Sequence, residues 1–131
     1  MTKANQHDTK LTLELLIAKK AQRLNRKMRT KDVYVDSLDC MVTLNEPSKE
    51  LVYKFSDRIQ ESDGSTAEKF MAFSYIISQC VDLFKDKSFY EEYGTPELAV
   101  HELLTFNDIN ILQTELNGLT YVNGVNEEIK N

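Results

Sequence analysis

The first hydrophobic pattern along the chain has the spacing of a helix. Between Lys10 and Met28 the apolar residues recur every three or four positions, which places them along one side of an α-helix. Five Lys and Arg residues occupy the second half of this segment, where the negative end of the helix dipole favours cations. The sequence therefore predicts a basic amphipathic helix that begins near Lys10. Its apolar stripe consists of Leu13, Leu16, Ile17, Ala21, Leu24 and Met28, with Lys20, Arg23 and Lys27 expected toward the other side.

The period of the pattern changes after this segment. The β-branched and apolar runs Val33–Val35 and Met41–Leu44 flank the polar stretch Asp36–Asp39, and such a pattern is typical of two strands joined by a turn. We expect a β-hairpin at about residues 32–44. Because two strands alone are marginally stable in water, the hairpin has to pack on helices or pair with another edge.

Helical spacing then returns. A second helix is expected to start at Pro47 or after Ser48, with its buried face at Leu51, Val52, Phe55 and Ile59. The segment Ser65–Glu68 has the pattern of a capping box and predicts the start of a third helix. This third helix is the most apolar in the chain, and we expect it at the centre of the core through Phe70, Phe73, Ile76, Ile77, Cys80, Val81 and Phe84.

Three further helices complete the predicted fold. A short helix at FYEEY is expected to stop at Gly94, and Thr95 with Pro96 predicts the next start, with Leu98, Ala99, Leu103 and Phe106 as apolar positions. Asn107 is the expected cap of a last helix that carries Ile109, Leu112, Leu116 and Leu119 and ends near Gly118. The pattern predicts a mainly α (α+β) protein of five to six helices with one N-terminal hairpin. It predicts a flexible arm at 1–9, a single domain at 10–119 and a loose tail at 120–131.

Length and composition agree with one globular domain. The chain has 131 residues, of which 41% are hydrophobic and 28% charged, which is enough apolar surface for a core without metal or disulfide support. No apolar run has the length of a membrane span, and the N-terminus has no signal-peptide pattern, so we expect a cytoplasmic protein without a membrane partner. The free cysteines Cys40 and Cys80 are too far apart in sequence for a CxxC pair, and we expect both to be at least half buried.

Charge is distributed unevenly along the chain. Nine basic and two acidic residues up to Lys31 give +7, the remainder carries −12, and the net charge is −5. An acidic main body disfavours a general nucleic-acid surface, since phosphate binding needs concentrated positive charge. Only the first helix could serve that purpose.

Catalytic patterns are weak throughout the sequence. His101 has Glu97 four residues before it, within reach of a carboxylate–imidazole contact, but no second His or Cys is spaced to complete a metal site. A solvated or capping histidine is therefore favoured over a metal ligand. The glycines form no nucleotide-binding loop. We therefore expect no enzyme, no cofactor, no metal and no small-molecule substrate. A small enzyme built around His101 and nearby carboxylates is a third, less favoured hypothesis.

Three interpretations of the basic helix stay open. Its cations could be a solvated face that complements the acidic body. Gln22 and Asn25 among Arg23 and Arg26 would suit a DNA-reading helix, although a helix-turn-helix would need a partner helix before it. Alternatively, Leu and Ile anchors flanked by cations suit a groove or an acidic surface on a protein partner.

The order of these features resembles a known family. The segment LTLELLIAKKAQRLNRKMRTKDVYVDSL, the helix start EPSKELV and the later FYEEYG with TPELAVHELL are together similar to the XkdN-like phage tail assembly chaperones of Gram-positive phages and prophages. The resemblance covers about Leu11 to Leu119. It implies a protein that acts in the bacterial host cytoplasm and is not part of the mature virion. Its implied partners are the tape measure protein, which it binds, and tail tube subunits, which it helps to recruit.

A chaperone of an apolar helical client needs exposed apolar surface with charge around it, and the first helix offers that combination. The residues expected at this partner-binding surface are Leu16, Ile17, Lys19, Lys20, Arg23, Leu24 and Lys27. The competing hypothesis is that the Leu and Ile residues belong to the core. A small phage DNA-binding regulator is the alternative function, and homo-oligomers through first helices or hairpin edges also stay open.

Overall fold

The computed structural model describes residues 9–24 and 26–121. Strand β1 (Thr30–Val35) pairs antiparallel with β2 (Cys40–Asn45), in a register that places Val33 opposite Val42. A 3₁₀ turn, η1 (Asp36–Leu38), joins the strands, and Asp39 follows it with a left-handed φ of 49°. The inward side chains Val33, Val35, Val42 and Leu44 are buried. The predicted hairpin is confirmed, and each strand extends beyond its apolar run because backbone pairing continues over polar residues.

The other elements are helices. In chain order they are α2 (Leu13–Leu24), α3 (Lys49–Glu61), α4 (Thr66–Cys80), the 3₁₀ helix η2 (Asp82–Lys85), α5 (Lys87–Tyr90), α6 (Pro96–Leu103) and α7 (Phe106–Tyr121). The described residues thus form a mostly helical protein with six α-helices and one N-terminal hairpin, and the predicted fold class is confirmed. No described helix is long and apolar enough to cross a membrane.

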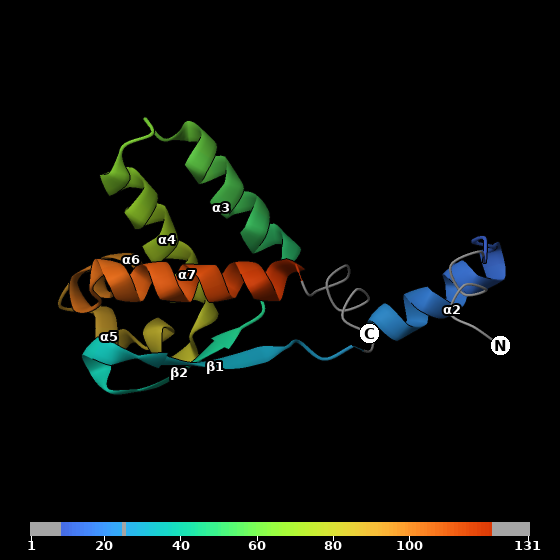
Figure 1. The fold of residues 1–131 in the computed structure, drawn as a ribbon, viewed down its shortest axis with the longest axis horizontal. Helices are drawn as coiled ribbons and strands as arrows, with labels where there is room; N and C mark the ends of the chain where they lie inside the picture. The colour runs from blue at the N-terminus through green and yellow to red at the C-terminus, as the bar shows by residue number, and fades with distance from the viewer. Residues whose placement is uncertain (1–8, 25, 122–131) are drawn as a thin grey trace.

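Helix α4 lies at the centre of the compact domain. It packs against α3, α6 and α7, and β1 and β2 pack on α7 and α4 (Figure 1). The core joins the inner face of the hairpin to α4, α6 and α7, as predicted for Ile76, Ile77, Cys80 and Phe84. Phe70 and Phe73 are only half-buried, at the edge of this core.

Side-chain caps fix several helix starts. Ser48, not Pro47, caps α3 by accepting the Leu51 amide at 3.1 Å, and Thr95 caps α6 ahead of Pro96. Ser65 accepts the Glu68 amide as predicted, but the Glu68 carboxylate accepts the amide of Asp63 instead of that of Ser65. Gly94 has a φ of 96°, which suits glycine because it has no Cβ to clash. Its amide donates to Tyr90 O at the end of α5.

The last two helices differ from the sequence prediction. Thr105, not Asn107, caps α7, because its hydroxyl accepts the Asp108 amide while Asp108 accepts the Thr105 amide. The helix continues through Gly118 to Tyr121 and thereby buries Leu119. Of the apolar positions predicted for α6, Ala99 is buried, whereas Leu98, Leu103 and Phe106 are exposed. The chain also buries Val100 and, just after the end of α6, Leu104. A short helix of eight residues buries only the side chains that face α4, which is a narrower face than its apolar pattern suggests.

Helix α2 lies apart from this domain. It starts at Leu13, three residues later than predicted, and ends at Leu24. None of its residues is buried. Figure 1 shows α2 beyond the N-terminal end of β1, away from the helices α3 to α7. Thr120 and Tyr121, predicted as the start of a loose tail at 120–131, are the last residues of α7. The rest of that tail and residues 1–8 of the predicted arm lie outside the described residues.

Candidate protein-binding surface

One face of α2 leaves four large apolar side chains in water. Leu13, Leu16, Ile17 and Leu24 are 72%, 49%, 59% and 77% exposed. Thr12 caps this helix, since its hydroxyl accepts the Leu15 amide at 3.2 Å. Contiguous apolar surface of this kind marks interaction sites on soluble proteins. The hypothesis that these Leu and Ile side chains belong to the protein's own core is therefore wrong for this structure.

The segment that follows α2 is fastened to the domain by a buried carboxylate. Glu46, only 2% exposed, accepts hydrogen bonds from the Arg26 guanidinium at 3.1 and 2.8 Å and from the Arg29 amide at 3.1 Å. Burial alone would raise the pKa of Glu46, but these hydrogen bonds outweigh it and hold that pKa below its ordinary value. The base of α2 is thus attached to the end of the hairpin.

Six of the seven residues predicted at the partner-binding surface lie on α2, and the seventh does not. Leu16, Ile17, Lys19, Lys20, Arg23 and Leu24 all lie exposed on α2. Lys27 lies beyond the end of the helix, so it does not share the α2 surface.

Lys20 was expected on the side of α2 opposite the apolar stripe, and it does not lie there. It follows Leu16 by four positions and Ile17 by three and precedes Leu24 by four, so helical geometry places it among them. The α2 face is therefore apolar with one ammonium group inside it.

A second apolar surface lies between α3, α4 and α7. Helix α3 buries none of its residues fully, and its half-buried side chains Val52, Phe55 and Ile59 form one wall of a groove of about 250 Å³. Ile76 and Leu116 are at its floor, and Ser56, Asn117 and Thr120 complete its polar edges. This surface is named the α3–α7 groove below.

The α3–α7 groove contains one polar atom without a partner. Gln113 is 5% exposed and lines the groove. Its amide nitrogen donates to Asn117 Oδ1 at 3.3 Å, but its oxygen, Oε1, is buried without a hydrogen-bond partner in the described part of the chain. A buried acceptor left in this way costs about 1–3 kcal/mol. A donor from an incoming chain would remove that cost.

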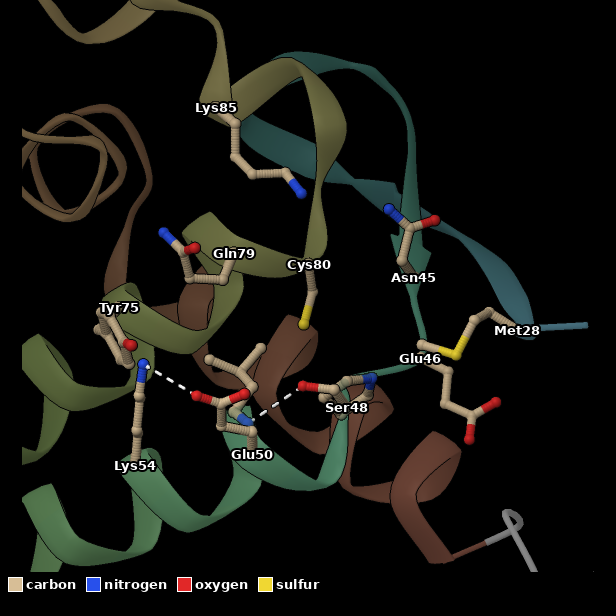
Figure 2. A pocket seen from close by; sticks show the side chains of 12 residues that line it. Met28, Asn45, Glu46, Ser48, Glu50, Lys54, Tyr75, Gln79, Cys80 and Lys85 are labelled. Carbon is tan, nitrogen blue, oxygen red and sulfur yellow. Dashed lines mark hydrogen bonds and ion pairs between the residues drawn. The ribbon is translucent and has the colours of Figure 1, made fainter. Parts of the chain in front are cut away.

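A more polar pocket of about 370 Å³ lies between α3, α4 and the end of β2 (Figure 2). Its charged residues are Glu46, Glu50, Lys54 and Lys85, of which Glu50 and Lys54 form an ion pair at 3.6 Å. Cys80 lines it, and burial raises the pKa of this thiol to about 12, which keeps it protonated and unreactive at neutral pH. The pocket therefore provides no activated nucleophile at Cys80.

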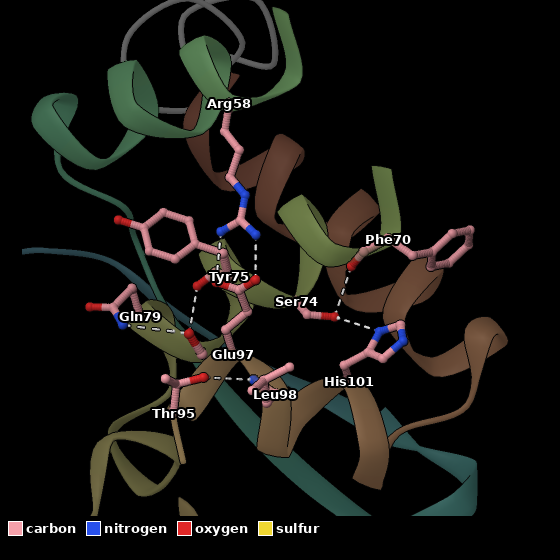
Figure 3. Close-up of polar contacts among 10 residues, drawn as sticks. Arg58, Phe70, Ser74, Tyr75, Gln79, Thr95, Glu97, Leu98 and His101 are labelled. Atoms are coloured by element: carbon pink, nitrogen blue, oxygen red, sulfur yellow. Dashed lines mark hydrogen bonds and ion pairs between the residues drawn. The ribbon is translucent and has the colours of Figure 1, made fainter. Parts of the chain in front are cut away.

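The surroundings of His101 are structural in character (Figure 3). Glu97, four residues before His101, is instead paired with Arg58 of α3 through both carboxylate oxygens. Arg58 also lies 5.3 Å from the centre of the Tyr75 ring. His101 Nδ1 is 3.5 Å from the Ser74 hydroxyl, which donates to Phe70 O. No group of three potential metal ligands occurs within the described residues.

Comparison with known proteins gives no further assignment: no family model, no curated protein and no solved structure matches the chain. The resemblance to the XkdN-like family thus depends on the order and spacing of the sequence motifs alone.

Sequence patterns could not reveal the α3–α7 groove. Val52, Phe55 and Ile59 have the pattern of a fully buried helix face, and only the tilt of α3 leaves this face open. Gln113 reads as an ordinary polar residue of an amphipathic helix. For the α2 face, the sequence did contain one usable signal. A helical projection places Lys20 within the apolar stripe.

Proposed function

We propose that this protein is a phage tail assembly chaperone that binds the tape measure protein through α2 and helps to recruit tail tube subunits during tail assembly. The observation that carries the proposal is the exposed apolar face of α2, formed by Leu13, Leu16, Ile17 and Leu24. The order of motifs similar to the XkdN-like family supports the choice of client.

The physical basis is protection of an apolar helix from aggregation. A long helical client with apolar stripes stays soluble if a carrier covers those stripes and presents charge to water. On α2, Lys19 and Arg23 lie next to the apolar stripe. Once the stripe is covered, these cations stay solvated, and they would also favour an acidic client surface.

Co-expression with the tape measure protein of the same phage genome tests the proposal. We expect the wild-type chain to increase the soluble fraction of the client severalfold and to co-purify with it. The variant Leu16→Glu/Ile17→Glu should lose both effects, because two carboxylates would be buried in the apolar contact. The control Ala18→Glu/Gln22→Glu adds the same charge on the other side of α2 and should behave as the wild type. Equal behaviour of the two variants contradicts the proposal.

The DNA-binding alternative has a separate test. Lys19, Lys20 and Arg23 are exposed on α2, so a random duplex is a suitable probe. A regulator would bind this duplex at low salt and lose affinity steeply toward physiological salt. We expect no binding at low salt, because the acidic remainder of the chain repels the phosphates of a duplex.

A further inference from the structure

Each copy of the chain carries both halves of one contact. The α2 helix exposes an apolar stripe, and the α3–α7 groove exposes an apolar trough that no described element fills. The two are not in contact within the chain, because α2 is held beyond the end of β1 by the Arg26–Glu46 pair (Figure 1). A second copy of the chain can therefore supply an α2 helix to the α3–α7 groove.

Size favours a helix as the occupant of the groove. The groove side chains extend from Val52 to Ile59 on α3 and from Gln113 to Thr120 on α7, which is two helical turns, or about 10 Å, on each wall. Helix α2 has 12 residues and is about 18 Å long. Its stripe can thus fill the groove along its full length with a turn to spare.

The polar groups also match. The apolar face of α2 contains a single ammonium group, that of Lys20, and the groove contains a single buried acceptor without a partner, Gln113 Oε1. A lysine inside an apolar contact is costly unless it donates to an acceptor. Because its stem is long, Lys20 can cover apolar surface and still extend its ammonium group toward a polar atom inside the groove.

The charge distribution also favours α2 of a second copy as the helix in the groove. Residues 30–121 hold seven basic and seventeen acidic residues, a balance of −10, whereas residues 9–29 hold seven basic residues and one acidic residue. The groove lining itself is uncharged. An incoming α2 would therefore place its apolar stripe against neutral side chains and its cations over an acidic domain.

From these observations we propose that two copies of the chain exchange their α2 helices, each α2 lying in the α3–α7 groove of the other copy with Lys20 donating to Gln113 Oε1. One short helix in a groove buries less than a stable interface needs, but a reciprocal exchange doubles the area and closes with two-fold symmetry. The proposal goes beyond the chaperone function and needs no client. It also makes self-association and client binding compete for the same face of α2.

Sedimentation equilibrium of the purified full chain is the first test. We expect a concentration-dependent shift from 15.1 kDa to twice that mass, with a dissociation constant on the order of 1–10 µM. A monomer at all concentrations up to roughly 1 mM overturns the proposal.

A mixing experiment separates exchange from other dimers. The helix variant Leu16→Glu/Ile17→Glu and the groove variant Ser56→Arg/Asn117→Arg should each be monomeric alone. An equimolar mixture should form a one-to-one complex, because the first retains a groove and the second retains a helix. Ala18→Glu/Gln22→Glu and Ala67→Arg/Thr114→Arg carry matched charges at exposed positions outside the contact and should dimerise as the wild type. Circular dichroism of each variant verifies its fold.

Two outcomes of the mixing experiment contradict exchange. If the groove variant dimerises alone, the dimer forms by α2 against α2 or through another surface. If the mixture stays monomeric although both variants are folded, the helix does not bind the groove.

The proposed hydrogen bond between Lys20 and Gln113 can be tested by its effect on dimer affinity. Lys20→Met should weaken dimerisation on the order of tenfold, and Gln113→Leu should weaken it to a similar extent in the wild type. The loss of dimer affinity in the double variant should be smaller than the product of the two single losses, because neither partner is then left unpaired. Additive effects contradict the Lys20–Gln113 contact.

Discussion

At the scale of single residues, Asp108 connects the tip of the hairpin to the start of α7. Its buried carboxylate accepts hydrogen bonds from the Ser37 hydroxyl and the Thr105 amide. Burial would raise the pKa of Asp108, but these donors outweigh it and hold that pKa below its ordinary value. We expect Asp108→Ala to lower the free energy of unfolding by about 1–3 kcal/mol at neutral pH.

The pH dependence of this loss has a defined sign. A carboxyl group with a lowered pKa in the folded state stabilises the fold above its unfolded pKa, about 3.9, and loses that contribution as pH falls through its folded value. The difference between wild type and Asp108→Ala in urea unfolding should therefore shrink below about pH 4. Asn107→Ala is the control, since Asn107 is exposed, and should cost less than about 0.5 kcal/mol. An equal loss at Asn107 would refute the Thr105–Asp108 cap.

The two cysteines should differ in reactivity. Both were expected to be at least half buried, but Cys40 is exposed on β2 while Cys80 is buried with a pKa of about 12. A disulfide reagent should therefore modify one thiol per folded chain within seconds to minutes and the second only after denaturant is added. The Cys40→Ser variant should show no fast phase. A fast phase that persists in this variant would mean that Cys80 is accessible.

At the scale of elements, the sequence could predict the α-helices and the hairpin, but not the 3₁₀ helix η2, which was expected as part of the third helix, nor which faces would be covered. Apolar spacing and capping residues are local signals, so Ser65 and Thr95 could be placed from sequence. Burial depends on the neighbouring elements: Leu103 was predicted among the apolar positions of its helix and is exposed, while Leu104 is buried. For the same reason the stripe of α2 could be predicted, whereas its freedom from the core, and the groove beside α3, required the packing of the whole chain.

The attachment of α2 can be tested at Glu46. We expect Glu46→Ala to lower the free energy of unfolding by about 1–3 kcal/mol, since three hydrogen bonds to a buried carboxylate are lost and Arg26 is partly solvated. Hydrogen exchange should show less protection at the Arg29 amide. Glu50→Ala removes an exposed pair with Lys54 and should cost about 0–0.5 kcal/mol. Similar losses in the two variants would mean that Glu46 has no special role at the base of α2.

At the scale of the whole molecule, the folded core and the helix that we propose as the binding surface are separate parts of the chain. Every residue of the hydrophobic core lies between Val33 and Leu119, and α2 contributes no buried side chain. Removal of residues 1–24 should therefore leave the unfolding free energy of the remaining chain within about 0.5 kcal/mol of the full-length value, measured by urea unfolding in dilute solution where the full chain is monomeric. The same truncation should abolish co-purification with the tape measure protein. A large loss of stability would mean that α2 packs on its own domain, and its apolar face would then be part of the fold and not available to a partner.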